Sequence, residues 1–297
     1  MKKRSLPSIL VAGLMRLMYP ERKTEQDVLA DKTMSPAVND VPYTLPKKPV
    51  FDDLREEIVN EAQVFHINEH SGEKTLVLYL HGGGYVHQPS VFHWLFVKRL
   101  IRETNCKVCV PIYPKAPNHQ YDEAYRLLDQ VYGEILGKYA DHRIIFMGDS
   151  AGGGLALGFA QTLPAKGLRS PDATVLFSPW LDITMQNEEA RQYEKSDPIL
   201  SILALQVWGK LWAGDTDAKD ARLSPMFGEL SNLRRVLLFT GTREVFYPDE
   251  LLFAKKLKDA GIEHRLVIGE GMNHIYPCLP IPEAADAMKE IVVWITE

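Results

Sequence analysis

The chain has 297 residues, of which 45% are hydrophobic and 25% charged, and its formal net charge at pH 7 is -5. This composition is typical of a globular protein, and the length is sufficient for one catalytic domain, residues 1–297, with a substantial core. A weakly acidic chain without an arginine-rich stretch is not expected to bind nucleic acid. Three cysteines, an odd number, argue against a disulfide framework and favour a reducing, cytoplasmic setting.

The N-terminus begins with the basic run Lys2-Lys3-Arg4 and continues into an apolar segment. Apolar residues recur there at helical spacing, at Leu6, Ile9, Leu10, Leu14, Leu17 and Met18. We expect an amphipathic helix whose apolar stripe packs against the rest of the protein, and we favour this over contact with a membrane surface. Arg16 interrupts the segment and no small-x-small cleavage site follows, so neither a signal peptide nor a membrane span is expected.

The remainder of the chain alternates short β-rich runs with segments of helical periodicity. This pattern predicts an α/β fold with a mostly parallel central sheet flanked by helices. The expected strands are 62–67, 75–80, 107–113, 143–147, 173–177, 235–240 and 264–268. The expected helices are 92–103, 121–139, 155–163, 249–260 and 283–295. Proline-rich residues 24–49 make 1–50 a helical N-terminal cap and connection, and the strand-free segment 182–225, with a helical pattern over 199–212, is a predicted cap insertion.

Cys106 and Cys109 form a C-x-x-C pair beside the expected strand 107–113. Positions three apart on a strand point to opposite faces, so the two thiols are not expected to act together in redox chemistry or metal binding. The sequence has no His-Glu-x-x-His motif or Cys/His cluster. Neither a metal nor another cofactor is therefore predicted.

The run Gly148-Asp149-Ser150-Ala151-Gly152 joins the expected strand 143–147 to a helix. A serine at the apex of a sharp strand-to-helix turn needs small residues two positions to either side, and both glycines meet this need. The following helix directs its free N–H groups toward the serine. A phosphate-binding turn is the alternative, but the P-loop lysine and the Rossmann spacing are missing. Ser150 is therefore the candidate nucleophile.

The run His81-Gly82-Gly83-Gly84 follows the expected strand 75–80. Glycines leave backbone N–H groups uncovered, so that a substrate carbonyl can approach them closely. A glycine triplet by itself is more often a flexible turn, but here it precedes a serine elbow. We assign the oxyanion hole to the amides of Gly83, Gly84 and Ala151.

These motifs together resemble the hormone-sensitive-lipase-like family of α/β-hydrolases, bacterial esterases with a His-Gly-Gly-Gly loop and a Gly-Asp-Ser-Ala-Gly elbow. Further segments are similar to motifs of that family, namely Tyr113-Pro-Lys-Ala-Pro117-Asn-His119, Ser178-Pro-Trp-Leu-Asp182, Ser224-Pro225 and Gly271-Met-Asn-His274. The resemblance extends from Thr75 to the C-terminus and is weaker over residues 1–50. It implies an α/β-hydrolase fold with a helical cap, ester hydrolysis and an orienting role for His81.

The nucleophile needs a base and a carboxylate that supports it. The resemblance places the histidine after the last strand, where His274 lies, and the acid after the strand before it. The family usually has Gly-x-x-Asp at that point, whereas this chain has Gly241-Thr-Arg-Glu244. Asp249 is the competing candidate, although it is typical of a first-turn helix residue. We predict a catalytic triad of Ser150, Glu244 and His274.

The predicted function is that of a serine carboxylesterase acting on small-molecule esters with short to medium acyl chains. Candidate substrate-binding residues are His81, Tyr85, Trp208 and Trp212, with packing inside the cap as the alternative for the two tryptophans. An amidase or peptidase with the same triad, an interfacial lipase that docks through its N-terminal helix, and a non-catalytic binding protein are the alternatives. The presence of His274 disfavours the last. Activity should rise as His274 deprotonates near neutral pH, and no oligomeric state is predicted.

Overall fold

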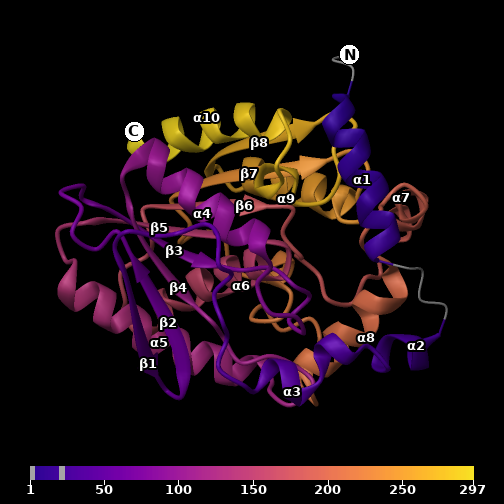
Figure 1. The fold of residues 1–297 in the computed structure, drawn as a ribbon, viewed down its shortest axis with the longest axis horizontal. Helices are drawn as coiled ribbons and strands as arrows, with labels where there is room; N and C mark the ends of the chain where they lie inside the picture. Colours follow the sequence, from indigo (N-terminus) through magenta and orange to yellow (C-terminus); the bar gives the residue numbers. More distant parts are fainter. Residues whose placement is uncertain (1–3, 20–23) are drawn as a thin grey trace.

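The computed structural model describes residues 4–19 and 24–297, so Lys2 and Lys3 of the basic N-terminal run lie outside the described residues. Its centre is an eight-stranded sheet with the strand order β1-β2-β4-β3-β5-β6-β7-β8 (Figure 1). The strands are β1 (Leu54–Val59), β2 (Ala62–Ile67), β3 (Thr75–Leu80), β4 (Lys107–Pro111), β5 (Arg143–Asp149), β6 (Ala173–Phe177), β7 (Arg235–Gly241) and β8 (Glu263–Gly269). Strands β3 to β8 pair in parallel, whereas β2 pairs antiparallel with both β1 and β4. The predicted mostly parallel sheet is confirmed.

Helices cover both faces of the sheet, as predicted. The flanking helices are α4 (Val91–Thr104), α5 (Tyr121–Lys138), α6 (Ser150–Thr162), α9 (Tyr247–Asp259) and α10 (Glu283–Thr296). Residues of α4 and α10 share one buried cluster with one face of the sheet, and residues of α5, α6 and α9 share another cluster with the opposite face. Apolar side chains on both sides explain why the central strands are hydrophobic almost throughout. Helix α6 begins at Ser150, where the elbow motif predicted a helix, whereas the apolar pattern alone starts only at 155 because glycines occupy the first turn.

Strand β1 is an element that sequence reasoning does not predict. Its segment Leu54–Val59 carries charged residues, and only Val59 is buried, because β1 is the edge strand of the sheet. One face of such a strand meets water, so the apolar pattern is weak. Pairing with β2 over its whole length makes it a strand.

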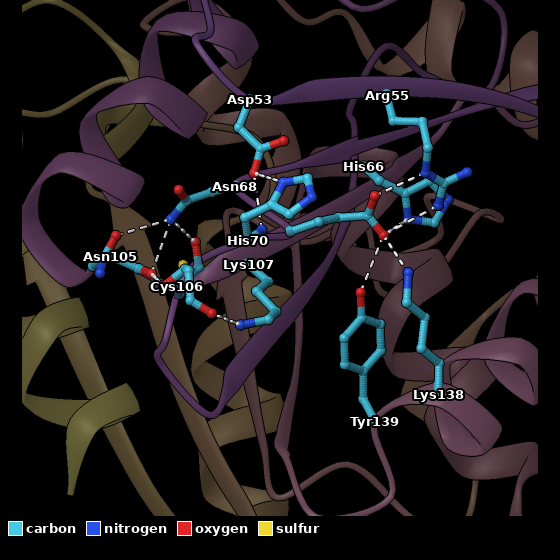
Figure 2. Close-up of polar contacts among 12 residues, drawn as sticks. Asp53, Arg55, His66, Asn68, His70, Asn105, Cys106, Lys107, Lys138 and Tyr139 are labelled. Atoms are coloured by element: carbon cyan, nitrogen blue, oxygen red, sulfur yellow. Dashed lines mark hydrogen bonds and ion pairs between the residues drawn. The ribbon is translucent and has the colours of Figure 1, made fainter.

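Strands β1 and β2 form a hairpin. A network of ion pairs joins the end of this hairpin opposite its turn to α5. The Glu69 carboxylate, which follows β2, accepts hydrogen bonds from Arg55 of β1 at 2.8 Å and from Lys138 of α5 at 2.7 Å (Figure 2). The Tyr139 hydroxyl donates to the same carboxylate at 3.1 Å. These hydrogen bonds, with the Arg55 contact as the largest influence, hold the pKa of Glu69 well below its usual range. The network joins elements that lie 69 residues apart in the chain.

The two cysteines of the C-x-x-C pair face opposite sides of the sheet, as predicted. Cys106 belongs to the buried cluster that contains α4 and α10, whereas Cys109 belongs to the cluster that contains α5 and α6. Burial raises the pKa of the Cys106 thiol to about 11 and also raises that of Cys109. Both are free thiols inside the core, where the neutral form packs as a small apolar group.

Residues before β1 and residues 182–225 form the two helical additions to this core. The N-terminal helices are α1 (Leu6–Met18), α2 (Glu25–Leu29) and α3 (Pro36–Asn39), and the later segment holds α7 (Arg191–Glu194) and α8 (Ile202–Ala213). Residues 182–225, all of which the structure describes, contain no strand. Helix α2 packs against α8, so the two additions meet (Figure 1).

Helix α1 forms where predicted, but the prediction of its packed face is wrong. Its buried residues are Ser8, Ala12 and Met15. The stripe that was expected to pack is exposed, with relative accessibilities of 68% for Leu6, 49% for Ile9, 64% for Leu10, 55% for Leu14, 82% for Leu17 and 58% for Met18. No helix in the described part of the chain is long and apolar enough to cross a bilayer.

The surface beneath α1 explains why Ser8 faces inward while the leucines face solvent. The Ser5 amide and hydroxyl both donate to the Glu283 carboxylate at 2.8 Å, at the start of α10. The Ser8 hydroxyl lies 3.9 Å from the Met272 sulfur in the loop after β8. Small and polar side chains can approach such a surface closely and satisfy its polar groups, whereas a row of leucines cannot.

Candidate active site

Ser150 lies at the junction of β5 and α6, at the carboxyl edge of the parallel sheet. Its backbone is in the left-handed region, with φ of 53°, which is a strained conformation for a residue with a side chain. A Cβ atom on Gly148 would lie 2.4 Å from the Gly152 carbonyl oxygen, and one on Gly152 would lie 2.1 Å from that of Leu80. Only glycine fits at either position, so the steric requirement inferred from the sequence is met.

The glycine loop after β3 lies against this elbow. The Gly82 amide donates to the Asp149 carboxylate at 3.1 Å, so it is already engaged, and the two amides after it are the ones the sequence assigned to an oxyanion. Gly83 and Gly84 have φ of 124° and 63°, which favours glycine at both positions. The Ala151 amide belongs to the first turn of α6, where N–H groups have no partner within the helix.

Asp149 anchors the glycine loop, a role that sequence reasoning missed. Its fully buried carboxylate accepts hydrogen bonds from the Tyr79 hydroxyl at 2.6 Å and from His93 Nε2 at 3.1 Å, in addition to the Gly82 amide. Burial alone would raise the pKa of Asp149, but the charge and hydrogen bond of His93 lower it overall. Burial likewise opposes the charged form of His93, and the Asp149 carboxylate raises its pKa. The sequence offered one signal for this role: Asp149 is an ionisable residue in a turn that must be buried, and such a group needs hydrogen-bond partners.

His81 is fully buried behind the loop. Its ring stacks on Tyr113 with ring centroids 4.4 Å apart, and its Nδ1 lies 2.7 Å from the Gly82 carbonyl oxygen. The Tyr113 hydroxyl donates to the His81 carbonyl at 2.7 Å. Burial lowers the pKa of His81 well below its usual value, which favours the neutral ring. These contacts suit an orienting role more than contact with a substrate.

His274 and Glu244 are in direct contact. His274 lies in the loop after β8, and its Nδ1 is 2.5 Å from Glu244 Oε2. The other carboxylate oxygen, Oε1, accepts hydrogen bonds from the Gly241 amide at 2.6 Å and the Ser178 hydroxyl at 2.8 Å. Glu244 is completely buried. Among the described residues, His274 Nε2 is buried without a hydrogen-bond partner.

The environment of His274 favours its protonated form. Burial lowers its pKa, but the hydrogen bond and charge of Glu244, followed by the charges of Asp197 and Asp149, raise the pKa above its usual value overall. Asp149, the last of these three, is the residue directly before Ser150. An imidazole held between carboxylates is a stronger base than a free one.

Asp249, the competing candidate for the acid, lies elsewhere. It is in the first turn of α9, as its sequence context indicated, and its Oδ1 accepts a hydrogen bond from the Asn187 side chain at 2.7 Å. Burial raises its pKa to about 6. Asp249 and Asp182 line a separate cavity of about 510 Å³. The carboxylate that meets His274 is therefore that of Glu244.

Two further residues next to the Glu244–His274 pair were not found by sequence reasoning. The Ser178 hydroxyl donates to Glu244 and accepts a hydrogen bond from the Ile275 amide at 3.0 Å, so it links the two loops. Asp197 accepts hydrogen bonds from the amides of Val245 at 3.1 Å and Ile199 at 2.9 Å. Burial raises the pKa of Asp197 to about 6. Ser178 stood within a family-like motif, but no pattern in the sequence pairs Asp197 with residue 245.

The aromatic candidates divide into two groups. Tyr85 and Trp212 are fully buried and stack with centroids 4.5 Å apart, and Trp180 also stacks on Tyr85, with centroids 5.4 Å apart. Their burial and stacking favour a packing role, and contact with a substrate stays a prediction for both Tyr85 and Trp212. Trp208 differs, because it lies against the glycine loop after β3. A Cβ atom on Gly84 would lie only 2.6 Å from its ring.

The comparisons with known proteins agree with this architecture. A family model described as the α/β-hydrolase fold matches residues 77–278. An esterase of Acinetobacter venetianus is 28% identical over 93% of this chain and 92% of its own, and an ethyl acetate hydrolase of Pseudomonas putida is 28% identical over 73% and 71%. The crystal structure of an esterase from the bacterial hormone-sensitive lipase family has 25% identity and a TM-score of 0.83 over 99% and 98% of the two chains.

Strand order, serine elbow, glycine loop and the histidine after the last strand thus coincide with a family match over most of the chain. The resemblance drawn from the motifs is confirmed. The chain belongs to the α/β-hydrolase fold family, as a hormone-sensitive-lipase-like member.

Proposed function

We propose that this protein is a serine carboxylesterase that hydrolyses small-molecule esters through an acyl-enzyme on Ser150. The observation that carries the proposal is the buried contact between Glu244 Oε2 and His274 Nδ1, which leaves Nε2 of the same ring without a partner among the described residues. An imidazole with this tautomer can accept a proton only through Nε2. The relatives named as esterases support the same reaction class.

In the first half of the reaction the Ser150 hydroxyl attacks the ester carbonyl carbon, and His274 Nε2 takes its proton. Glu244 keeps Nδ1 protonated and stabilises the imidazolium. The carbonyl oxygen becomes an anion that the amides of Gly83, Gly84 and Ala151 would bind. Collapse of the tetrahedral species transfers the proton from Nε2 to the leaving alkoxide, which departs as an alcohol.

In the second half, water attacks the acyl-enzyme while His274 Nε2 accepts its proton. The same three amides hold the second oxyanion, and the proton returns to Ser150 as the carboxylic acid leaves. Every proton transfer passes through one nitrogen atom. The roles of the remaining residues are therefore to fix the tautomer, the ring orientation and the loop geometry.

Short to medium acyl esters are the proposed substrates. Ser150 is only 6% exposed, and the Trp208 ring packs against Gly84, so we take Trp208 as one wall of the acyl site. The ethyl acetate hydrolase among the relatives supports a small acyl group. We propose that residues 1–50 and 182–225 act as the cap that closes the rest of the site.

A fluorophosphonate probe tests the nucleophile, because it reacts only with an activated serine. The wild-type protein should be labelled at Ser150 and Ser150→Ala should not. Labelling in the wild type of any serine other than Ser150, or full ester hydrolysis by Ser150→Ala, would contradict the proposal. A series of p-nitrophenyl esters from acetyl to dodecanoyl should give the highest kcat/KM among the shorter chains, and matched anilides should react far more slowly.

A further inference from the structure

The outer face of α1 is the most apolar exposed part of the N-terminal segment. We define the outer α1 face by six residues, Leu6, Ile9, Leu10, Leu14, Leu17 and Met18, which are between 49% and 82% exposed. At 3.6 residues per turn these six positions share one half of the helix surface. The other half holds the buried residues Ser8, Ala12 and Met15. The helix lies against the sheet domain beside β8 and near α7 (Figure 1).

Packing within the chain does not account for this face. The contacts of α1 with the rest of the protein come from its other half, through Met15 and the partly buried Val11, which pack on the apolar core, and through the hydrogen bonds of Ser5 to Glu283. A soluble helix would carry polar residues on its outer half. A contiguous row of exposed leucines instead marks a surface that binds another apolar surface.

The charges of this segment select the kind of partner. Residues 1–20 contain Lys2, Lys3, Arg4 and Arg16 and no aspartate or glutamate, although the whole chain has a net charge of -5. Arg16 donates to the neutral carbonyl oxygen of Lys195, and Arg4 donates to Ser8 and also lies near the carboxylate of Glu283, so that carboxylate offsets one of the four basic charges. An apolar helix face with basic residues and no acidic ones matches a bilayer whose head groups are anionic.

We propose that the outer α1 face docks on the surface of an anionic phospholipid membrane. The leucines enter the acyl boundary, and the basic residues meet the phosphates. A second copy of the chain matches this face less well, because residues 1–20 of each copy carry only basic charges, and two such helices would bring like charges together. The helix lies in the plane of the surface and does not span it.

This docking would bring the active site to the interface. Helix α1 rests on the loop that carries His274, through the contact of Ser8 with Met272 and the packing of Arg4 beside Gly271. Esters that partition into the bilayer would then reach Ser150 without crossing much water. Only this statement about substrate supply rests on the proposed function; the docking itself does not.

Sedimentation with large unilamellar vesicles tests the docking directly. The full-length protein is mixed with vesicles of phosphatidylcholine alone or of phosphatidylcholine with phosphatidylglycerol, and its bound fraction is measured. The test variant replaces three exposed leucines of α1 together, Leu10→Gln, Leu14→Gln and Leu17→Gln. The matched control replaces three apolar residues elsewhere that are 64%, 62% and 51% exposed, namely Val50→Gln, Ile58→Gln and Leu252→Gln.

Wild type and control should bind the anionic vesicles. The partition coefficient of the α1 variant should be lower than that of the wild type by at least about tenfold. Equal hydrolysis of a dissolved short ester by both triple variants shows that the folds are intact. Equal binding by the two triple variants, or no binding by the wild type, overturns the proposal. So does a wild-type dimer that becomes monomeric in the α1 variant without vesicle binding. Vesicle binding by a wild type that hydrolyses no ester supports the docking and refutes only the esterase function.

Discussion

Replacement of Glu244 by glutamine removes one charge from the site with little change in volume. Glu244 Oε1 accepts hydrogen bonds from the Gly241 amide at 2.6 Å and from Ser178 at 2.8 Å. The oxygen of a glutamine should keep these two donors, which leaves its NH₂ group facing His274 Nδ1. Two donors cannot pair, so the ring should shift its proton to Nε2. That nitrogen could then no longer accept the proton of Ser150.

The magnitude follows from this change of tautomer. The equivalent substitution in a serine triad lowers kcat by about 10⁴, which corresponds to about 5 kcal/mol in the activation barrier. We expect Glu244→Gln to lose on the order of 10³–10⁴ in kcat. The pKa of His274 should fall too, because Glu244 is the main influence that opposes burial there. The acid limb of kcat/KM should therefore move to lower pH.

The assay is steady-state hydrolysis of a dissolved short-chain ester between pH 5 and 9, on protein whose fold is checked by circular dichroism. Asp249→Asn is the matched control, because Asp249 pairs with Asn187 and not with the imidazole. It should keep a kcat close to that of the wild type. If Asp249→Asn is the impaired variant, or Glu244→Gln keeps more than about a tenth of the activity, the assignment of the acid is refuted.

Three further predictions follow from the geometry. Gly84→Ala should lower kcat by about 10²–10³, because its Cβ would lie 2.6 Å from the Trp208 ring and displace an oxyanion amide. Asp197→Asn should shift the acid limb of kcat/KM to lower pH, because it removes a charge that raises the pKa of His274. Burial raises the pKa of Asp249 from 3.8 to about 6, so stability should fall as pH rises through that window. Asp249→Asn should remove this loss and raise Tm by a few degrees at pH 8 but not at pH 4.

Each of these predictions has its own control. Gly72→Ala adds a Cβ that meets no atom within 4 Å, and should leave kcat unchanged. An unchanged acid limb in Asp197→Asn would show that its charge does not reach His274. A Tm difference for Asp249→Asn that is the same at pH 4 and pH 8, followed by scanning fluorimetry, would contradict the titration argument.

Local sterics and chain order made much of the site predictable. The elbow around Ser150 requires glycine at two positions for reasons contained in the turn itself, which explains why five residues identify it. His274 follows from the order of motifs along the chain. The face to which each cysteine of the C-x-x-C pair points follows from the period of a strand, and the two buried clusters agree.

Other features depended on contacts between distant segments. Glu244 and Asp249 were both acceptable acids by sequence, and only the packing of two loops decided which reaches the imidazole. Asp197 accepts a hydrogen bond from the Val245 amide, 48 residues later in the chain. A single sequence gives no pattern that predicts this contact. Strand β1 forms because its backbone pairs with that of β2 along its whole length.

Helix α1 separates the two kinds of information most clearly. Its sequence determined that a helix forms and that one half of it is rich in leucine, because helical periodicity is a property of the segment alone. The half of the helix that packs inward depends on the surface it meets. There the Glu283 carboxylate accepts a hydrogen bond from Ser5, and Ser8 is small enough to lie close to Met272. Hydrophobic patterning predicts burial only when the chain itself supplies an apolar surface to bury against.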